Sequence, residues 1–186
     1  MSDTGKVIIE GNYFGGSAPF CAGSKMLFSS GSSLINLGLS NTSVTNSSFS
    51  NNTIQNITSS SNLTLTQFNG FPINIENNVL GNPSVPNDII AASGFGFIGY
   101  SGYNGSNSIN IKGNSASNIS IPNNNGNSCT LLSFSSTGNK VKNITNNSFK
   151  NISTGNSTFY GINIATSNGG GNISYNVLEN IHQTNV

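Results

Sequence analysis

A nine-residue pattern recurs six times in this chain of 186 residues, and it constrains the fold more than any other feature of the sequence. The first position is apolar in every copy, the fourth is Asn and the sixth is apolar. The copies begin at Ile9, Phe49, Ile75, Ile111, Ile144 and Ile173. Successive copies start 40, 26, 36, 33 and 29 residues apart, so the period is irregular and the extra length is expected in loops.

Individual positions of the pattern have distinct chemical characters. The fourth-position asparagines are Asn12, Asn52, Asn78, Asn114, Asn147 and Asn176. The sixth-position apolar residues are Phe14, Ile54, Leu80, Ala116, Phe149 and Leu178. The eighth position is Asn in five copies, namely Asn56, Asn82, Asn118, Asn151 and Asn180. The third position is Gly or Asn in five copies, and these residues most readily adopt the left-handed backbone of a tight bend. Each copy is therefore predicted to form a short strand, a bend and a second short strand.

A second apolar segment, rich in β-branched and aromatic residues, lies between successive copies. These segments are KMLFSS from Lys25, LTLTQF from Leu63, IIAASGFGFIGYS from Ile89, TLLSFSS from Thr130 and FYGINIAT from Phe159. Such composition is typical of strands, and no segment has a sustained helical period. Gly, Ser, Asn and Pro predict loops at 15–24, 31–47, 81–88, 99–108 and 120–128. The chain is therefore predicted to be all-β.

Stacked coils explain why one Asn recurs at one register. A propeller or a sandwich also contains many short strands, but neither requires the same residue at the same place in every repeat. In a coil that stacks on the previous coil, equivalent residues form columns at the inter-strand spacing of ~4.8 Å. An amide both donates and accepts, so a column of Asn side chains can be hydrogen-bonded along its length. Residues 1–186 are therefore predicted to form a single parallel β-helix domain with internal Asn ladders.

The strings ITNNSFKNI and ISYNVLENI, each paired with a segment such as GINIAT, resemble a known family of repeats. They are similar to the right-handed parallel β-helix repeats of pectin-lyase-like proteins, phage tailspikes and microbial surface adhesins. The resemblance covers residues 7–181 and implies a right-handed solenoid of about five to six irregular coils. No capping helix is evident at either end. The resemblance implies several functions, since β-helices of this kind serve as enzymes, adhesins and fibre shafts.

The side chains needed for the family's chemistry are scarce. A lyase of this kind would need clustered Asp and a basic residue, often Arg, yet the chain has no Arg and its acids are Asp3, Glu10, Glu76, Asp88 and Glu179. Glu10 and Glu76 are expected in one column with Ser50 between them, somewhat farther apart than an inverting carboxylate pair. His182 is the sole histidine, and Cys21 and Cys129 are expected to be separate thiols. No catalytic, cofactor-binding or metal-binding residue is therefore predicted.

The net charge and the length of the apolar runs limit the kinds of partner that are expected. Six Lys and five acidic residues give a net charge of +1, which offers no basic stripe for nucleic acid. No apolar run approaches the ~18 residues of a membrane span, and the N-terminus lacks the pattern of a secretory signal. Lys150 and Glu179 share the seventh motif position in successive copies, so stacking predicts that they lie side by side.

The function expected from these features is structural and non-enzymatic. The chain is expected to form, or belong to, an extracellular fibre, an appendage or a surface adhesin, and to associate with itself end to end or laterally. The expected location is extracellular, on a cell surface or on a virion surface. The alternative is a carbohydrate-binding or polysaccharide-degrading fragment of a tailspike-like or lyase-like protein. Tyrosines suited to stacking on a sugar, or equally to packing on a β-surface, are Tyr13, Tyr100, Tyr103, Tyr160 and Tyr175.

Overall fold

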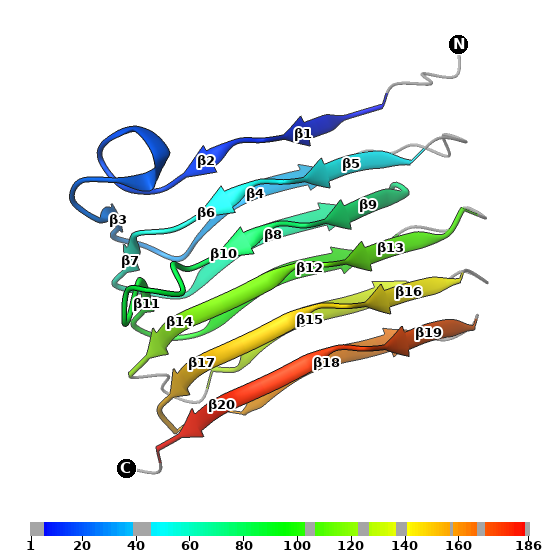
Figure 1. The fold of residues 1–186 in the computed structure, drawn as a ribbon. Helices are drawn as coiled ribbons and strands as arrows, with labels where there is room; N and C mark the ends of the chain where they lie inside the picture. Colours follow the sequence, from blue (N-terminus) through cyan, green and yellow to red (C-terminus); the bar gives the residue numbers. More distant parts are fainter. Residues whose placement is uncertain are drawn as a thin grey trace.

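Strands of successive turns stack in parallel into three sheets in the computed structural model of the chain (Figure 1). The structure describes residues 6–38, 46–102, 107–122, 127–136, 141–156, 158–166 and 170–184. The two ends of the chain lie at opposite ends of the stack. Every strand pair is parallel, and partners in a pair come from successive turns. The predicted all-β parallel β-helix is confirmed.

The first sheet contains the opening strand of each motif copy. Its strands, in spatial order, are β1 (Ile8–Glu10), β5 (Ser47–Ser50), β9 (Ile73–Glu76), β13 (Ile109–Lys112), β16 (Lys142–Thr145) and β19 (Gly171–Ser174). The second sheet follows the bend. In each of the first three turns this sheet has two short strands that follow one another along the chain. They are β2 (Tyr13–Phe14) and β3 (Met26–Phe28), β6 (Thr53–Ile54) and β7 (Ile57–Ser59), and β10 (Val79–Leu80) and β11 (Ile89–Ala91). It continues as the single long strands β14 (Ser115–Ile121), β17 (Ser148–Thr154) and β20 (Val177–Gln183).

The third sheet contains the apolar segments between motif copies. Its strands are β4 (Ser32–Gly38), β8 (Leu63–Asn69), β12 (Phe95–Ser101), β15 (Cys129–Ser136) and β18 (Phe159–Thr166). The third sheet has five strands, so the chain makes four complete turns from β4 to β18; the first sheet has six strands and spans five turns from β1 to β19. The expected five to six coils therefore slightly exceed the number of complete turns.

The bend between the first and second sheets is left-handed in every turn. Its residue has a positive φ between 55° and 68° at Gly11, Asn51, Asn77, Gly113, Asn146 and Tyr175. These are the third motif positions, where Gly and Asn meet the steric requirement at low cost and Tyr175 is the exception. The predicted bend is confirmed, and it places the following Asn at the same point of each turn.

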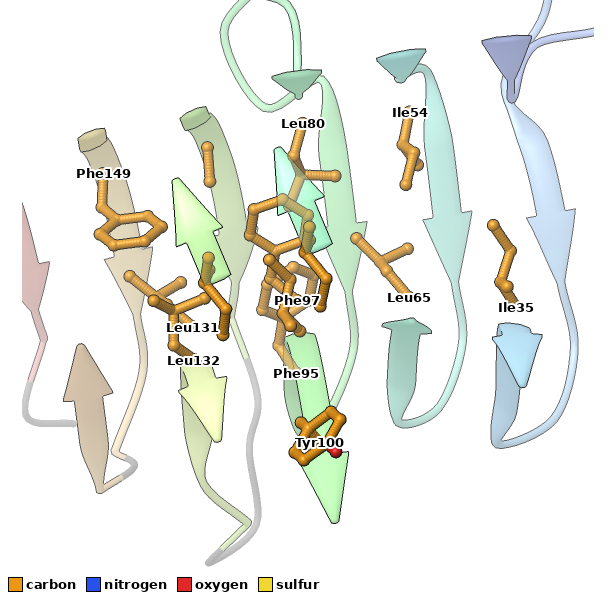
Figure 2. Packing of buried hydrophobic residues seen from close by; sticks show 14 of the residues in the cluster. Ile35, Ile54, Leu65, Leu80, Phe95, Phe97, Tyr100, Leu131, Leu132 and Phe149 are labelled. Atoms are coloured by element: carbon orange, nitrogen blue, oxygen red, sulfur yellow. The ribbon is translucent and has the colours of Figure 1, made fainter. Parts of the chain in front are cut away.

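Apolar side chains of all three sheets meet in one core. Figure 2 labels members of this core from the second and third sheets. The sixth motif positions form a column through strand register, with Leu80 beside Ile54 on one side and Ala116 on the other. Ile54, Leu80, Ala116 and Phe149 are at most 1% exposed, whereas Phe14 and Leu178 occupy the two ends of the column. The predicted core column is confirmed.

Several predicted loops are partly strands. Residues 32–38 of the expected loop 31–47 form β4, because Leu34, Ile35 and Leu37 supply the apolar face that Ser and Asn obscure in the sequence. The ends of β12 and β14 likewise extend into the expected loops 99–108 and 120–128. The loops 15–24 and 81–88 are confirmed; both interrupt the second sheet at one corner, and the first includes the 3-10 turn η1 (Pro19–Cys21). The described ranges contain no α-helix.

Candidate functional site: the asparagine ladders and the solenoid ends

The fourth-position asparagines form a continuous hydrogen-bonded ladder. The backbone N–H and the Nδ2 of each one donate to Oδ1 of the Asn in the next turn, at 2.8–3.1 Å. From Asn52 onward, Nδ2 also donates to a backbone carbonyl of the preceding turn at 2.8–3.0 Å. Asn52, Asn78, Asn114 and Asn147 are fully buried, so every donor and acceptor of their amides is used inside the protein. The predicted ladder is confirmed.

This inner ladder has a direction. Each Oδ1 accepts from the turn before it, and each amide donates to the turn after it. At the C-terminal end, Asn176 Nδ2 donates to Ile144 O, but the described residues supply no acceptor for the Asn176 backbone N–H. At the N-terminal end, Asn12 Oδ1 has no donor in the described residues, and Asn12 Nδ2, besides donating to Asn52 Oδ1, donates to Glu10 O of its own turn at 3.1 Å. One end of the ladder therefore offers donors, and the other offers an acceptor.

The eighth-position column departs from the sequence pattern at one turn. Ile57, Ile89 and Ile119 are paired in register, so the residue aligned with Asn56 and Asn118 is Asp88 rather than Asn82. Asn82 lies in the inserted loop 81–88. Buried Asp88 accepts from the backbone N–H groups of Asn56 and Asn82 at 2.9 Å, and thereby fixes the loop to the preceding turn. Farther along, Asn180 Nδ2 donates to Asn151 Oδ1 at 3.0 Å.

A second asparagine ladder lies on the outer face of the first sheet. Asn110 Nδ2 donates to Asn74 Oδ1, and Asn143 Nδ2 donates to Asn110 Oδ1, both at 2.8 Å. Each of these asparagines stands one residue before the first motif position, and they are register partners in neighbouring strands. This outer ladder was not predicted from the sequence. The signal was present as Ile-Asn-Ile in β9 and β13 and Asn-Ile in β16, one residue before the first motif position.

The C-terminal turn exposes side chains that are buried elsewhere in the same columns. Ile173 and Leu178 are 53% and 45% exposed, whereas their register partners Ile144 and Phe149 are 1% and 0% exposed. Leu178 also leans across the end of the core, since its Cδ2 would lie 2.4 Å from a Cβ placed on Gly161. Within the described residues, the last turn thus ends in apolar surface and in a strand edge, β19 and β20, on which no further strand is stacked.

The N-terminal turn carries exposed apolar side chains on its outer surface. Tyr13 and Phe20 form an edge-to-face pair with centroids 5.0 Å apart, and they are 53% and 73% exposed. Leu27 is 77% exposed and Ile8 is 57% exposed. Most of the large apolar side chains that are exposed in the described residues therefore belong to the first and last turns.

The carboxylates are spread over the molecule. Glu10 and Glu76 share one column with Ser50 between them, as predicted. Glu10 Oε1 accepts from Asn51 Nδ2 at 2.9 Å, and Glu76 has Lys112 as its register partner in the next strand. Within the described ranges, no three His, Cys, Asp or Glu side chains gather closely enough to hold a metal ion.

The single histidine and the two cysteines lie on different elements, β20, η1 and β15. His182 is exposed on β20, beside Ser153. Cys21 and Cys129 are buried free thiols, as expected. Burial raises the pKa of the Cys129 thiol to about 12, and burial is also the largest cause of the raised pKa of Cys21. Neither thiol is therefore activated as a nucleophile.

The five tyrosines do not share one surface. Tyr100 is buried, donates its hydroxyl to Phe71 O at 2.8 Å and stacks on Phe134, so its proposed role as a sugar contact is wrong. Tyr160 and Tyr175 are exposed on β18 and after β19. Tyr103 lies outside the described residues.

A hollow of about 270 Å³ lies on the outer face of the third sheet. The hollow is centred on Gly96 and Gly99 of β12, which lack side chains, and it is bordered by Gln67, Thr130 and Ser133. Gln67 reaches across Gly99, since its Oε1 would lie 2.1 Å from a Cβ at that position. The surface of the hollow is neutral and polar.

Two lysines have distinct environments. Lys150 Nζ lies 2.7 Å from Glu179 Oε2, so the predicted pair of successive turns is confirmed. Lys142, in contrast, faces the core in the column of Ile73 and Ile109, with its Nζ 5.9 Å from the centroid of the Phe134 ring. A buried lysine was not predicted from the sequence, because a charge at an otherwise apolar position has no signature of its own.

Comparison of the chain with protein-family models, curated proteins and solved structures finds no match. Across the described part of the chain, none of the helices has the length and apolar character needed to cross a membrane. The geometry of the ladders and of the end turns is therefore the basis for assigning a function.

Proposed function

We propose that the chain is a non-enzymatic structural protein that associates with itself through the open ends of its solenoid. The observation that carries this proposal is the exposure of core columns at the last turn, where Ile173 and Leu178 are 53% and 45% exposed. An apolar strand edge with unpaired backbone groups is a template for another strand. In solenoids, such an end is covered either by a cap or by a further coil.

The interior supports a mechanical role. Buried asparagines tie each turn to both of its neighbours, and the sheets are parallel throughout, so the turns form one continuous hydrogen-bonded stack. The sides carry few charges, with Lys150 and Glu179 in one exposed ion pair. A stack of this kind is a stiff, weakly charged rod, which suits a fibre, an appendage or the shaft of an adhesin. We place it outside the cell, on a cell surface or on a virion surface, among proteins like the pectin-lyase-like, tailspike and adhesin β-helices.

The distribution of carboxylates supports a non-enzymatic role. Glu10 and Glu76 are two inter-strand spacings apart, about 10 Å, which exceeds the ~6.5–9.5 Å of inverting glycosidase pairs. Asp88 already accepts two backbone hydrogen bonds inside a loop. Replacing Glu10 and Glu76 together with Gln tests the enzyme alternative. A polysaccharide-cleaving activity that these two changes abolish would overturn the non-enzymatic proposal.

Sedimentation velocity over a range of concentrations tests the structural proposal. We expect association that increases with concentration and elongated particles by electron microscopy. A chain that stays monomeric through the micromolar range would contradict the proposal.

Carbohydrate binding is the second candidate, and the hollow at Gly96 and Gly99 is the observation that favours it. Amide and hydroxyl groups of Gln67, Thr130 and Ser133 border the hollow, and Tyr160 is the register partner of Thr130. Neutral polar groups beside an exposed aromatic ring suit a neutral saccharide. Titration with neutral oligosaccharides tests this, with Gly96→Gln as the variant that fills the hollow. Its Cβ would meet Thr64 at an ordinary 3.7 Å. Binding that Gly96→Gln removes supports the candidate, and absence of binding rejects it.

A further inference from the structure

We propose that two copies join head to tail, with the C-terminal turn of one copy stacked on the N-terminal turn of the next so that the inner asparagine ladder continues from Asn176 to Asn12. This inference deepens the proposed function and rests on it, since it names the partner surface and its register. The direction of the ladder and the side-chain columns at the two ends support this joint.

The hydrogen-bonding groups of the two end turns are complementary. Inside the solenoid, the backbone N–H and Nδ2 of Asn147 both donate to Asn176 Oδ1. If the next copy repeats this geometry, Asn176 donates in the same way to Asn12 Oδ1. Asn12 Nδ2 is then able to leave Glu10 O, its bond at the open end, and donate to the Ile173 carbonyl, as Asn176 does to Ile144.

Backbone bonds of the bend extend the same match. In the interior, Asn146 N donates to Ser174 O at 3.2 Å and Val177 N donates to Asn147 O at 2.8 Å. Continuing this pattern, the Tyr175 N–H of one copy meets Glu10 O of the next, and the Tyr13 N–H of the next copy meets Asn176 O. Joining two C-terminal ends opposes the ladder donors of Asn176 to each other, and joining two N-terminal ends opposes the Asn12 Oδ1 acceptors, so the ladder selects a head-to-tail joint.

The side-chain columns are also compatible. Register places Ile173 against Ile9 and Leu178 against Phe14, which joins apolar side chains that face the core. On the outer face, Val177 meets Tyr13, and both are exposed in the single chain. The joint brings no two like charges into one column. It forms along the first two sheets, because the third sheet ends one turn earlier, at β18.

The inserted loop 15–24 at the N-terminal turn is compatible with this stacking. The third turn has an insertion, 81–88, at the same corner, and it still pairs with the turn before it through Ile57 and Ile89. Gly81 N donates to Ile54 O at 2.9 Å beside this insertion. A loop at this corner therefore leaves the strand edge accessible to a preceding coil.

A charge pair across the joint tests its register. In the joint, Ser174 of one copy lies beside Glu10 of the next copy in the same column. Ser174→Glu places like charges there and is expected to weaken association about threefold, and adding Glu10→Lys is expected to restore it. The matched control is Thr145→Glu, which adds the same charge one turn further in, between Lys112 and Ser174 of its own copy.

A second variant blocks one end only. Ile173→Lys puts a charge into the apolar centre of the joint, at a site that is half-exposed in the single chain, and is expected to weaken self-association more than about a hundredfold. Because its N-terminal turn is intact, this variant is expected to shorten wild-type assemblies when mixed in as a minor component. Thermal unfolding of each variant checks that the single chain still folds.

The outcomes separate the joint from the proposed function. Wild-type association that responds to Ser174→Glu, Glu10→Lys and Ile173→Lys as described supports both. If the strength of association is unchanged by all of these substitutions, the head-to-tail joint is wrong, but the proposed self-association is still supported. A wild-type chain that does not associate at all overturns the proposed function and the joint together.

Discussion

Asn114 accepts two hydrogen bonds from Asn78 at a single oxygen, one from the backbone N–H at 3.1 Å and one from Nδ2 at 2.8 Å. Asn114 is fully buried, and its own Nδ2 donates to Ile75 O at 2.8 Å and to Asn147 Oδ1 at 3.0 Å. Its amide thus joins three turns without water. The ladder is therefore both a structural tie and the feature that gives the solenoid a direction.

Asn114→Ala is expected to lower the free energy of unfolding by about 3–5 kcal/mol, because it leaves several buried donors and acceptors unpaired and removes side-chain volume. Urea denaturation measures this change. The matched control is Asn143→Ala, which removes one rung of the half-buried outer ladder and is expected to cost about 1 kcal/mol or less. Equal costs for the two variants would contradict a special role for the buried ladder.

The ladder and the bend were predictable from the sequence because each has a strict chemical requirement. A left-handed corner is cheapest with Gly or Asn, and a buried column needs a side chain that both donates and accepts. Those requirements fall on adjacent motif positions. An Asn-Asn pair therefore indicates both the bend and the ladder, as at Asn51–Asn52 and Asn77–Asn78. Tyr175 breaks the first rule at the last turn, where its side chain points into solvent and is 83% exposed.

The remaining features were hidden because their requirements are looser. The apolar residues of β4, Leu34, Ile35 and Leu37, stand among Ser, Asn and Gly, so in the sequence this short strand resembles a polar loop. Asp88 replaces Asn in its column because a carboxylate also accepts backbone hydrogen bonds, and the insertion before it shifts the apparent alignment to Asn82. The exposure of Ile173 depends on its place at the end of the stack, which residue type does not reveal.

Two glycines with nearly the same φ angle allow conformational strain to be distinguished from close packing. Gly11 and Gly81 have φ of 68° and 70°, so Ala at either site carries the strain of a left-handed backbone, about 1 kcal/mol. A Cβ at Gly11 meets nothing within 4 Å, whereas one at Gly81 lies 1.9 Å from the backbone oxygen of Ser117 in the next turn. Gly81→Ala is expected to destabilise by about 3 kcal/mol or more. Thermal or urea unfolding compares the two variants, and a similar loss at both sites would show that the turns are not in close contact at Gly81.

The ion pair between Lys150 and Glu179 reports on register but adds little stability. Both side chains are about half-exposed, at 45% and 49%. Glu179→Gln is expected to cost about 1 kcal/mol or less, and the cost is expected to shrink as salt is added. Exchanging the two residues, with Lys150→Glu and Glu179→Lys together, is expected to recover stability that either single charge reversal loses. A double variant no more stable than the single reversals would contradict the predicted pairing of β17 with β20.

The pH dependence of stability is expected to carry the signature of Cys129. Burial raises the pKa of this thiol to about 12, while in the unfolded chain it ionises near 8.5. Between these values the folded chain keeps a proton that the unfolded chain releases, so the contribution to stability is complete below about pH 8.5 and is lost as the pH rises toward 12. From about pH 8 to about pH 10 this group alone is expected to lower the free energy of unfolding by about 2 kcal/mol.

Cys129→Ala separates the contribution of this thiol to the pH dependence of stability from that of the lysines and tyrosines. The variant loses stability at neutral pH, because it removes a buried sulfur between Phe95 and Phe159 of the neighbouring strands. Its further loss from about pH 8 to about pH 10 is expected to be smaller than that of the wild type by about 2 kcal/mol. Urea denaturation of both proteins at the two pH values measures the difference. Parallel losses in the two proteins would mean that the thiol is accessible to water in the folded chain, and a thiol reagent would then label Cys129 without unfolding.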